Sequence, residues 1–568
     1  MATTSRRYRG KLYQTHLLRR TFRVGSQVKH ETLGNISHLP LELIDLIRRG
    51  LAGEKFLPAS AAFQILRNLP HGHVQAVLGT MRKLGIDSLL SSRPCPERNL
   101  VLAMIAERLL YPCSKLATTR LWHTTTLAEE LAVTEATEDN LYRAMDWLLA
   151  RQARIESKLA ARHLSEASTV LYDVTSSYYE GHTCPLARRG HDRDGKRGLP
   201  IIVYGLLTDL EGRPVAVEVY PGSTGDPTTV ADQVEKLRQR FGLTRAVLVG
   251  DRGMLTQAQI NKLKQYPGLG WISALRGPAI RELVEAGSLQ LSLFDEQNLG
   301  EIRSEEFPGE RLVACFNPLL ADERRRKRQE LLEATAQQLD RIAAEVRRRK
   351  RTPMPQTVIA LKVGKVLNRF KVAKHFLLSI ADGHFSWTRH EESIRREAQL
   401  DGIYVIRTSE PAERLSAAEA VRRYKGLAQV ERAFRTLKGI DLRVRPIHHR
   451  TADHVRAHVF LCMLAFYVEW HMRKALAPLL FEDEELDADR LRRDPVARAE
   501  ASSSARTKKQ ARVTTDGFPV HSFDTLLREL STRCKNTCRV AADPNGATFQ
   551  QLTAATPLQA RALELLGL

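Results

Sequence analysis

Three acidic residues of this chain have the surroundings expected of metal-binding carboxylates. Asp173 in STVLYDVTSSYYEG and Asp251 in RAVLVGDRGM each lie where an apolar, β-branched run gives way to polar residues, a pattern typical of a strand that runs into a loop. Glu431 lies in the helical pattern YKGLAQVERAFRTLK. Carboxylate oxygens are the ligands that Mg²⁺ prefers, and two such ions roughly 3.5–4 Å apart stabilise the attacking and leaving oxygens of a phosphodiester. The three acids predict a two-Mg²⁺ site for phosphoryl transfer, in which Mn²⁺ should substitute.

The predicted Glu431 helix carries polar residues along one face. Tyr424, Glu431 and Lys438 recur at intervals of seven residues. Because seven residues make almost two turns of an α-helix, these side chains should form one stripe. The stripe combines a carboxylate with a cation on a basic helix.

Each acid also has an ordinary structural explanation. Asp173 could form a salt bridge, Asp251 could belong to a simple Asp-Arg-Gly turn, and Glu431 could pair with Arg435 one helical turn later, which would contribute only a few tenths of a kcal/mol. The order strand, strand, helix, together with the register of the stripe, favours the metal site over these alternatives.

The net charge limits the class of partner. The chain has 568 residues, 43% of them apolar, and a formal net charge of +22, so it can form several cores, with two to four domains expected. Lys and Arg are spread over most of the length, which favours a long polyanion such as DNA or RNA over a small acidic substrate. A merely basic soluble or ribosome-associated protein is the alternative.

Cysteine and apolar patterns predict a protein of a reducing compartment. The seven cysteines are scattered, which argues against a disulfide framework. Cys534 and Cys538 form the only close pair and are predicted to be ordinary thiols on a short helix rather than zinc ligands. The N-terminus lacks the apolar run of a signal peptide, and no apolar stretch reaches the roughly 20 residues that span a bilayer. We expect a cytoplasmic protein without membrane contact.

The first two predicted regions are a basic helical module and a sheet. In residues 1–165, the segments LYQTHLLRRTFRV and QVKHETLGNIS, joined at Gly25 and Ser26, predict a β-hairpin, and four helical patterns follow. In residues 166–277, three strand patterns precede alternating helices and strands, which predicts a mixed sheet covered by helices. The acids at the ends of its first and fourth strands should then face each other at one rim.

The remaining chain is predicted to contain an insertion, the second part of the core and a tail. Residues 278–405 combine the strand-like runs TVIALKV, KHFLLSIA and DGIYVIRT with a long helix over 322–351, in which Leu332, Leu339 and Val346 recur at heptad spacing. Residues 406–476 return to the core with the Glu431 helix. In residues 477–568, FEDEELDAD and ASSSARTKKQAR predict a mobile linker before a small C-terminal segment.

These features resemble the DDE-class transposases of bacterial insertion sequences, in the branch with a β-rich insertion between the second Asp and the Glu. In that family the glutamate helix carries a Tyr, Arg, Glu, Lys signature with two, three and six intervening residues. Tyr424, Glu431 and Lys438 fit this signature, whereas Leu427 occupies the arginine position. The loop GHDRDGKRGLP also resembles the segment that leads into the second strand of the family's sheet.

The resemblance implies a fold, a reaction and a set of partners. The fold would be an α/β, RNase H-like mixed sheet with a β-rich and helical insertion and a mainly helical N-terminal region. By analogy, Asp173 would bridge two Mg²⁺ ions, and Asp251 and Glu431 would each complete one. The protein would cleave the terminal inverted repeats of its own mobile element and join the 3′-hydroxyl ends to target DNA. We expect a homodimer assembled on double-stranded DNA ends and associated with the bacterial nucleoid.

DNA contacts are expected on the Glu431 helix. Tyr424 and Lys438 should contact phosphates near the cut, as a hydrogen-bond donor and a point charge respectively, while Arg432 or Arg435 supplies the charge missing at Leu427. Two alternatives remain, namely a metal-dependent RNase H-like nuclease without end joining and an inactive DNA-binding relic.

Three further residues, Trp387, His454 and His458, are candidates for recognition of DNA. Trp387 could stack on an exposed base, although a core position is favoured. For His454 and His458, four residues apart in ADHVRAHVFLCML, packing or phosphate contact is favoured over metal binding.

Overall fold

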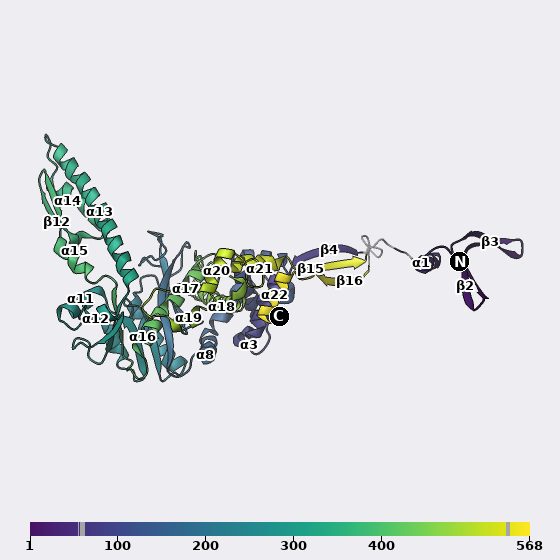
Figure 1. Cartoon of the computed structure of the whole chain (residues 1–568), viewed down its shortest axis with the longest axis horizontal. Coiled ribbons are helices and arrows are strands. Elements are labelled where there is room, and N and C mark those ends of the chain that lie inside the picture. Colours follow the sequence, from purple (N-terminus) through teal and green to yellow (C-terminus); the bar gives the residue numbers. More distant parts are fainter. Residues whose placement is uncertain (55, 57–62, 541–545) are drawn as a thin grey trace. The chain divides into compact units, whose positions relative to one another are not determined.

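The computed structural model describes residues 1–54, 56, 63–540 and 546–568. Its internal contacts divide the chain into two units. Unit 1 comprises Met1–Leu69 with Cys534–Thr553, and unit 2 comprises Pro70–Arg533 with Ala554–Leu568. The structure therefore groups residues 70–165 with the sheet that follows them, whereas the sequence suggested one N-terminal region. Figure 1 labels the elements.

Unit 1 consists mainly of β-strands. The predicted hairpin is confirmed, because β2 (Lys11–Val24) and β3 (Gln27–Asn35) pair antiparallel across the Gly25–Ser26 turn. It gains a third strand, β1 (Ala2–Tyr8), and α1 (Leu41–Leu51) follows. A second sheet has the strand order β16-β15-β4, and its strands are β4 (Phe63–Pro70), β15 (Cys534–Val540) and β16 (Thr548–Leu552).

The predicted short helix at Cys534 and Cys538 is wrong. Both residues lie on β15, which pairs antiparallel with β16. The sequence CKNTCRV has too few apolar residues to favour one period over another, so the pairing partner decides its conformation. Cys538 is buried and Cys534 is partly exposed.

A helical layer in unit 2 surrounds the long helix α18 (Ala452–Leu476). Sixteen residues of α18 are buried, so this helix is apolar on all sides, as expected for a helix inside a core. It packs against β7 and against the helices α2, α4, α7 and α22. The other helices of the layer are α2 (Gly72–Lys83), α3 (Ile86–Leu90), α4 (Pro96–Leu110), α5 (Lys115–Leu121), α6 (Leu127–Glu130), α7 (Glu138–Leu149), α8 (Gln152–His163), α21 (Phe523–Ser531) and α22 (Pro557–Leu566).

The predicted mixed sheet is confirmed and is larger than expected. Its strand order is β10-β11-β14-β9-β8-β5-β6-β7. The strands β5, β6 and β7 are antiparallel neighbours, while β8 and β9 run parallel to β5. These five strands are β5 (Ser168–Tyr178), β6 (Ile201–Thr208), β7 (Pro214–Pro221), β8 (Ala246–Val249) and β9 (Leu269–Ala274). The helices between them are α9 (Val230–Glu235) and α10 (Gln257–Leu263). Helices cover the sheet, so its central strands are buried on both faces.

Three strands of the predicted insertion belong to this same sheet. The strand β14 (Ile403–Thr408) pairs antiparallel with β9 and with β11 (Arg311–Phe316), and β10 (Leu299–Ile302) follows at the edge. The helices α11 (Gly277–Glu285) and α12 (Leu293–Glu296) precede them. The chain leaves the sheet after β11 and returns at β14, so the separate part of the insertion is the segment between these two strands.

That segment has its own apolar core. The predicted long helix is confirmed as α13 (Pro318–Arg348), and its heptad residues Leu332, Leu339 and Val346 are buried. It packs along α14 (Gln356–Phe370) (Figure 1). The remaining elements are the hairpin strands β12 (Phe376–Ala381) and β13 (His384–Arg389) and the helix α15 (Glu391–Ala398). Trp387 packs against this core and donates from Nε1 to Asp340 at 3.1 Å, so the favoured core position is confirmed.

The predicted strand TVIALKV is wrong, because the segment lies within α14. Its β-branched residues suggested a strand, but the buried residues Ile359 and Val363 are four apart. This spacing places them on one helical face, which packs against α13.

The predicted mobile linker after residue 476 is also wrong. The segments form α19 (Leu486–Arg492) and α20 (Ser503–Ala511), and both are fixed by polar contacts. The Ser502 backbone N–H donates to Asp483 at 2.8 Å, and Lys508 Nζ donates to Glu484 and to the carbonyl of Ala477. Low-complexity composition therefore does not produce a free linker here, because specific acid and base partners lie nearby. In the described residues, no helix is long and apolar enough to cross a membrane.

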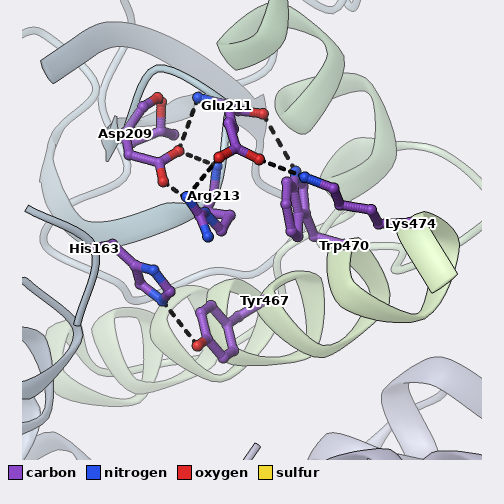
Figure 2. Close-up of polar contacts among 8 residues, drawn as sticks. His163, Asp209, Glu211, Arg213, Tyr467, Trp470 and Lys474 are labelled. Carbon is purple, nitrogen blue, oxygen red and sulfur yellow. Dashed lines mark hydrogen bonds and ion pairs between the residues drawn. The ribbon is translucent and has the colours of Figure 1, made fainter. Parts of the chain in front are cut away.

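A polar cluster joins the β6–β7 hairpin to α18 (Figure 2). Arg213 donates from Nε to Asp209 at 2.6 Å, and its guanidinium lies 5.2 Å from the centre of the Trp470 ring. Lys474 on α18 donates to Glu211 at 2.6 Å. The hairpin turn is thus held on the central helix by the Trp470 ring and by one ion pair, Lys474–Glu211, while the Arg213–Asp209 pair lies within the hairpin itself.

We expect Trp470→Ala to lower the free energy of unfolding by about 1–3 kcal/mol, because it removes packing area and two cation contacts. Lys474→Gln should cost less than about 1 kcal/mol, since that ion pair is exposed. Denaturation followed by circular dichroism would measure both changes. Equal losses in the two variants would contradict this account of the cluster.

Candidate active site

The parallel pairing of β5 with β8 sets Asp173 beside Asp251. Leu171 on β5 is in register with Val249, the last residue of β8. Asp173 and Asp251 each lie two residues beyond this pair. Adjacent strands are about 4.8 Å apart, and residues two apart share a face of the sheet, so the strand pairing brings the two acids to the same edge.

The position of Asp173 differs from the sequence prediction. It is the sixth of the eleven residues of β5, not the last, because β5 continues in its pairing with β6 after β8 has ended. The side chain is half-buried, and the Val174 N–H donates to its Oδ1 at 2.7 Å. Burial raises the pKa of Asp173 to about 7; the nearby charges of Asp251 and Glu431 also raise it, while the Val174 hydrogen bond lowers it.

Asp251 lies in a turn that fixes one of its oxygens. The backbone N–H groups of Gly253 and Met254 donate to Oδ1 at 3.0 and 2.7 Å. A Cβ on Gly253 would lie 3.3 Å from Oδ2, so glycine leaves space around the carboxylate. The Asp-Arg-Gly sequence is therefore a turn that presents an exposed acid. The structural explanation, a simple turn, is thus compatible with the functional one, a metal-binding carboxylate.

Glu431 comes from α17 (Leu427–Lys438), which packs on β5. The apolar face of α17 is buried and comprises Leu427, Val430, Ala433, Phe434 and Leu437. Glu431 is exposed beside this face, and its charge acts on Asp173. The structure therefore brings the three predicted acids into one electrostatic neighbourhood. Within the described part of the chain, no three acid, His or Cys side chains are arranged to hold a metal ion in this conformation.

The predicted single stripe is divided between two helices. α16 (Ala417–Lys425) ends just before Gly426, and α17 begins just after it, although Gly426 keeps helical angles of φ −56° and ψ −25°. A Cβ on this residue would lie 2.8 Å from the Arg423 carbonyl oxygen and 3.5 Å from Leu171 Cδ1. Glycine thus permits the helix junction to approach β5 closely.

Tyr424 lies beside the three acids. Burial raises the pKa of its hydroxyl to about 12, and the charges of Asp251, Glu431 and Asp173 act in the same direction. The phenol therefore stays protonated and able to donate a hydrogen bond at neutral pH. It also lines a cavity of about 160 Å³ with Arg252 and Tyr404.

Lys438 is held by internal partners, which the sequence analysis did not anticipate. Its Nζ donates to the Ser176 carbonyl at 2.5 Å and to Asp194 Oδ1 at 2.9 Å. Arg445 pairs with the same carboxylate, whose side chain is only 2% exposed. Lys438 thus attaches the end of α17 to β5 instead of standing free for DNA.

Asp194 is the main residue that sequence reasoning missed. It belongs to the loop GHDRDGKRG, which runs back along β5: Ser176 donates to the His191 carbonyl, and the Tyr178 N–H donates to Asp194. Asp192 and Asp194 flank Arg193 in this loop, and this pair of acids beside a cation was the sequence feature that could have identified it. Arg193 itself pairs with Asp226 and lowers the pKa of Asp173 through its charge.

Arg432 and Arg435 meet the requirements for binding a polyanion. Both are exposed on α17, and neither side chain has an ion-pair or hydrogen-bond partner among the described residues. Cations that are free of internal partners can neutralise phosphates.

Comparison with known proteins gives the family of this chain. The family described as "Transposase DDE domain" matches residues 164–468, which is more than half of the sequence. The similar solved structures include a piggyBac transposase synaptic complex with hairpin DNA, with 10% identity and a TM-score of 0.33, covering 81% of this chain and 76% of that one. They also include a Mos1 transposase paired-end complex, with 11% identity and a TM-score of 0.15, covering 46% and 74%. The comparison with curated proteins gives no match.

The match includes Asp173, Asp251 and Glu431 and the whole insertion between the last two. The expected family is therefore confirmed, and the chain belongs to the transposases with a DDE domain.

Proposed function

We propose that this transposase binds the terminal inverted repeats of its own mobile element, cleaves the DNA ends by two-metal phosphodiester hydrolysis and joins the freed 3′-hydroxyl ends to target DNA. The observation that carries the proposal is the register of β5 and β8, which sets Asp173 beside Asp251, with the Glu431 helix packed against the same strand. Three acids that share one electrostatic neighbourhood repel one another, and bound cations would relieve this repulsion.

The donor set fits Mg²⁺. Asp173, Asp251 and Glu431 offer only oxygen ligands, and the Asp251 Oδ2 atom has no hydrogen bond to the described residues. We propose that Asp173, Asp251 and Glu431 would together hold the ions. Bound Mg²⁺, or Mn²⁺ in its place, supplies charge neutralisation at the attacking and leaving oxygens.

The protein side chains near the acids have separate tasks in this proposal. Water attacks the phosphodiester at the element's end, and the freed 3′-hydroxyl then attacks target DNA. Tyr424 donates a hydrogen bond near the cut, and Arg432 and Arg435 bind the phosphates of the strand. Lys438 positions α17 through Asp194 and the Ser176 carbonyl.

The partners follow from the reaction. Two ends of double-stranded DNA must be cut and joined together, so we propose that a homodimer assembles on them. The net charge of +22 supports association with DNA over long distances, and we place the protein in the bacterial cytoplasm, on the nucleoid.

Asp173→Asn, Asp251→Asn and Glu431→Gln should each abolish metal-dependent cleavage and leave DNA affinity within about threefold, because affinity depends on Lys and Arg contacts. Purified variants would be incubated with Mg²⁺ or Mn²⁺ and DNA carrying the element's own ends, and the products separated on a sequencing gel. Asp322→Asn on α13 is the matched control, since this acid is exposed and its ion-pair partner in the described part of the chain is the exposed Arg325.

The products of the wild-type chain decide between the proposed reactions. Cuts at the repeat boundary and joined products, both lost on chelation with EDTA, are expected. Cuts scattered through any DNA would identify a nuclease without end joining, and products equal to those of Asp173→Asn would identify an inactive relic.

Asp194→Asn should lower the free energy of unfolding by about 3 kcal/mol, because it leaves Lys438 and Arg445 without their buried counter-ion. Asp173→Asn should instead leave stability unchanged or raise it, because it removes a carboxylate that burial and two neighbouring acids disfavour. Thermal melts in EDTA would compare the two isosteric changes. A larger loss for Asp173→Asn would show that Asp173 is held by a structural ion pair.

A further inference from the structure

A second basic site lies inside unit 2, apart from the three acids. A cavity of about 740 Å³ is formed by the end of α4, the start of α5, α7, the start of α18 and the loop that follows α17. Two cations in its wall, Arg108 and Lys115, are only 6% and 4% exposed. Their burial distinguishes this cavity from the many exposed basic patches of the chain.

Among the described residues, neither of these buried cations has an acidic partner. The hydrogen bonds of the Arg108 guanidinium within that part of the chain go to the carbonyl oxygens of Leu442 and Cys113, both at 3.5 Å. Lys115 makes no side-chain hydrogen bond or ion pair with the described residues. Burial, and then the Arg108 charge, lower the pKa of the Lys115 ammonium to about 7. The lowered pKa shows that burial without an acidic partner disfavours the charged ammonium, and an anion between the two residues would favour the charged form again.

Glu107, a buried acid next to Arg108 in the sequence, does not supply this anion. It precedes Arg108 on α4, and its Oε2 has no hydrogen-bond partner among the described residues. Burial raises the pKa of Glu107 to about 8, although the Arg108 charge lowers it, so the carboxyl is mainly neutral at pH 7. Two other acids, Glu138 and Asp139, line the cavity from the start of α7.

The rest of the wall adds positive charge and neutral rings. Arg443, Arg445 and Arg450 line the cavity from the loop after α17, so five cations face two lining acids. Burial lowers the pKa of His449 to about 3, and its neutral ring packs 4.9 Å from the His458 ring. Packing, one of the two favoured roles for the α18 histidines, is confirmed for the buried His458, whereas His454 stacks on Tyr142 and its Nε2 lies 3.2 Å from Asp146.

Arg445 connects this cavity to the acid site. It pairs with Asp194, which accepts a hydrogen bond from Lys438, and Lys438 donates to the Ser176 carbonyl on β5. Ser176 lies three residues after Asp173 on the same strand, a distance of about 10 Å. The cavity and the acids are thus connected by one series of contacts that begins on β5.

We propose that this cavity binds a backbone phosphate of the DNA strand between Arg108 and Lys115. The proposal rests on the proposed function for the identity of the polyanion, whereas the site itself rests on the two buried, unpaired cations. Phosphate contacts of this kind fix the position of the strand without reading its sequence. The site would hold the DNA in place relative to Asp173 while the reaction proceeds.

The test measures DNA binding in EDTA with Asp173→Asn protein, so that cleavage plays no part. Fluorescence anisotropy with a duplex carrying the element's own end gives Kd at several salt concentrations. Adding Lys115→Met should weaken binding about tenfold and reduce the slope of log Kd against log salt by about 0.9, the value for one lost phosphate contact. The melting midpoint should stay the same or rise, because the substitution removes an unpaired buried charge.

Lys236→Met is the matched control. Lys236 is also 4% exposed, but it pairs with Glu156 and Glu218. This variant should lower the melting midpoint and leave the salt slope unchanged. Arg108→Met is a second test of the same site, to be used in place of Lys115→Met if circular dichroism shows that the latter does not fold.

A methylphosphonate scan then locates the contact, because each analogue removes the charge of one phosphate. One analogue should weaken binding by the protein with Lys115 intact and have no effect on the Lys115→Met variant. An unchanged salt slope in Lys115→Met, or a fall in melting midpoint like that of Lys236→Met, would overturn the proposal. A third result would also overturn the proposal. In it, inorganic phosphate stabilises the protein with Lys115 but not the Lys115→Met variant, while the two proteins bind DNA equally. The site would then hold a free anion. If the wild-type chain binds the DNA end normally but does not cleave it, the proposed function is contradicted and the phosphate site is not.

Discussion

The parallel pairing of β5 with β8 is the constraint on which the site depends. It involves only four residues of each strand, yet it determines which acids can meet. Because the register places Leu171 opposite Val249, the residues two further on, Asp173 and Asp251, fall on the same edge and face. A shift of one residue would turn one acid to the opposite face. The third acid depends on the same strand, because α17 packs its apolar side on β5.

Bringing three carboxylates together opposes folding unless other charges compensate. The charge of Arg193 acts on Asp173 and partly compensates, whereas Lys438 and Arg445 are paired with Asp194. These cations are held by Asp226, Asp194 and backbone carbonyls, so they do not occupy the space between the three acids. The arrangement leaves the acids mutually destabilised in the absence of metal, which is the electrostatic state that favours uptake of divalent cations.

The features that the sequence predicts well are those with a local cause. The strand patterns around Asp173 and Asp251, the heptad of α13 and the Gly25–Ser26 turn each depend on periodicity or turn chemistry within a few residues. The features that it predicts poorly depend on distant partners. The sequence CKNTCRV becomes a strand because β16 pairs with it, ASSSARTKKQAR is fixed by contacts to Asp483 and Glu484, and Lys438 is captured by Asp194 from 244 residues away. The register that unites the acids likewise follows from the assembled sheet, so the sequence could nominate the acids without establishing that they meet.

The cations of this chain divide into two groups, one exposed and one buried, which suit the capture and the alignment of DNA respectively. Exposed cations such as Arg432 and Arg435 attract any phosphate, and salt screens them strongly. Arg108 and Lys115 differ because they are buried and have no acidic partner among the residues that the structure describes, so an anion gains more by reaching them and must give up its water to do so. Exposed charge would then govern the capture of DNA, and buried charge would govern its alignment with Asp173. In this arrangement, the buried cations destabilise the free protein, and a phosphate stabilises them when the DNA strand lies in position for the reaction.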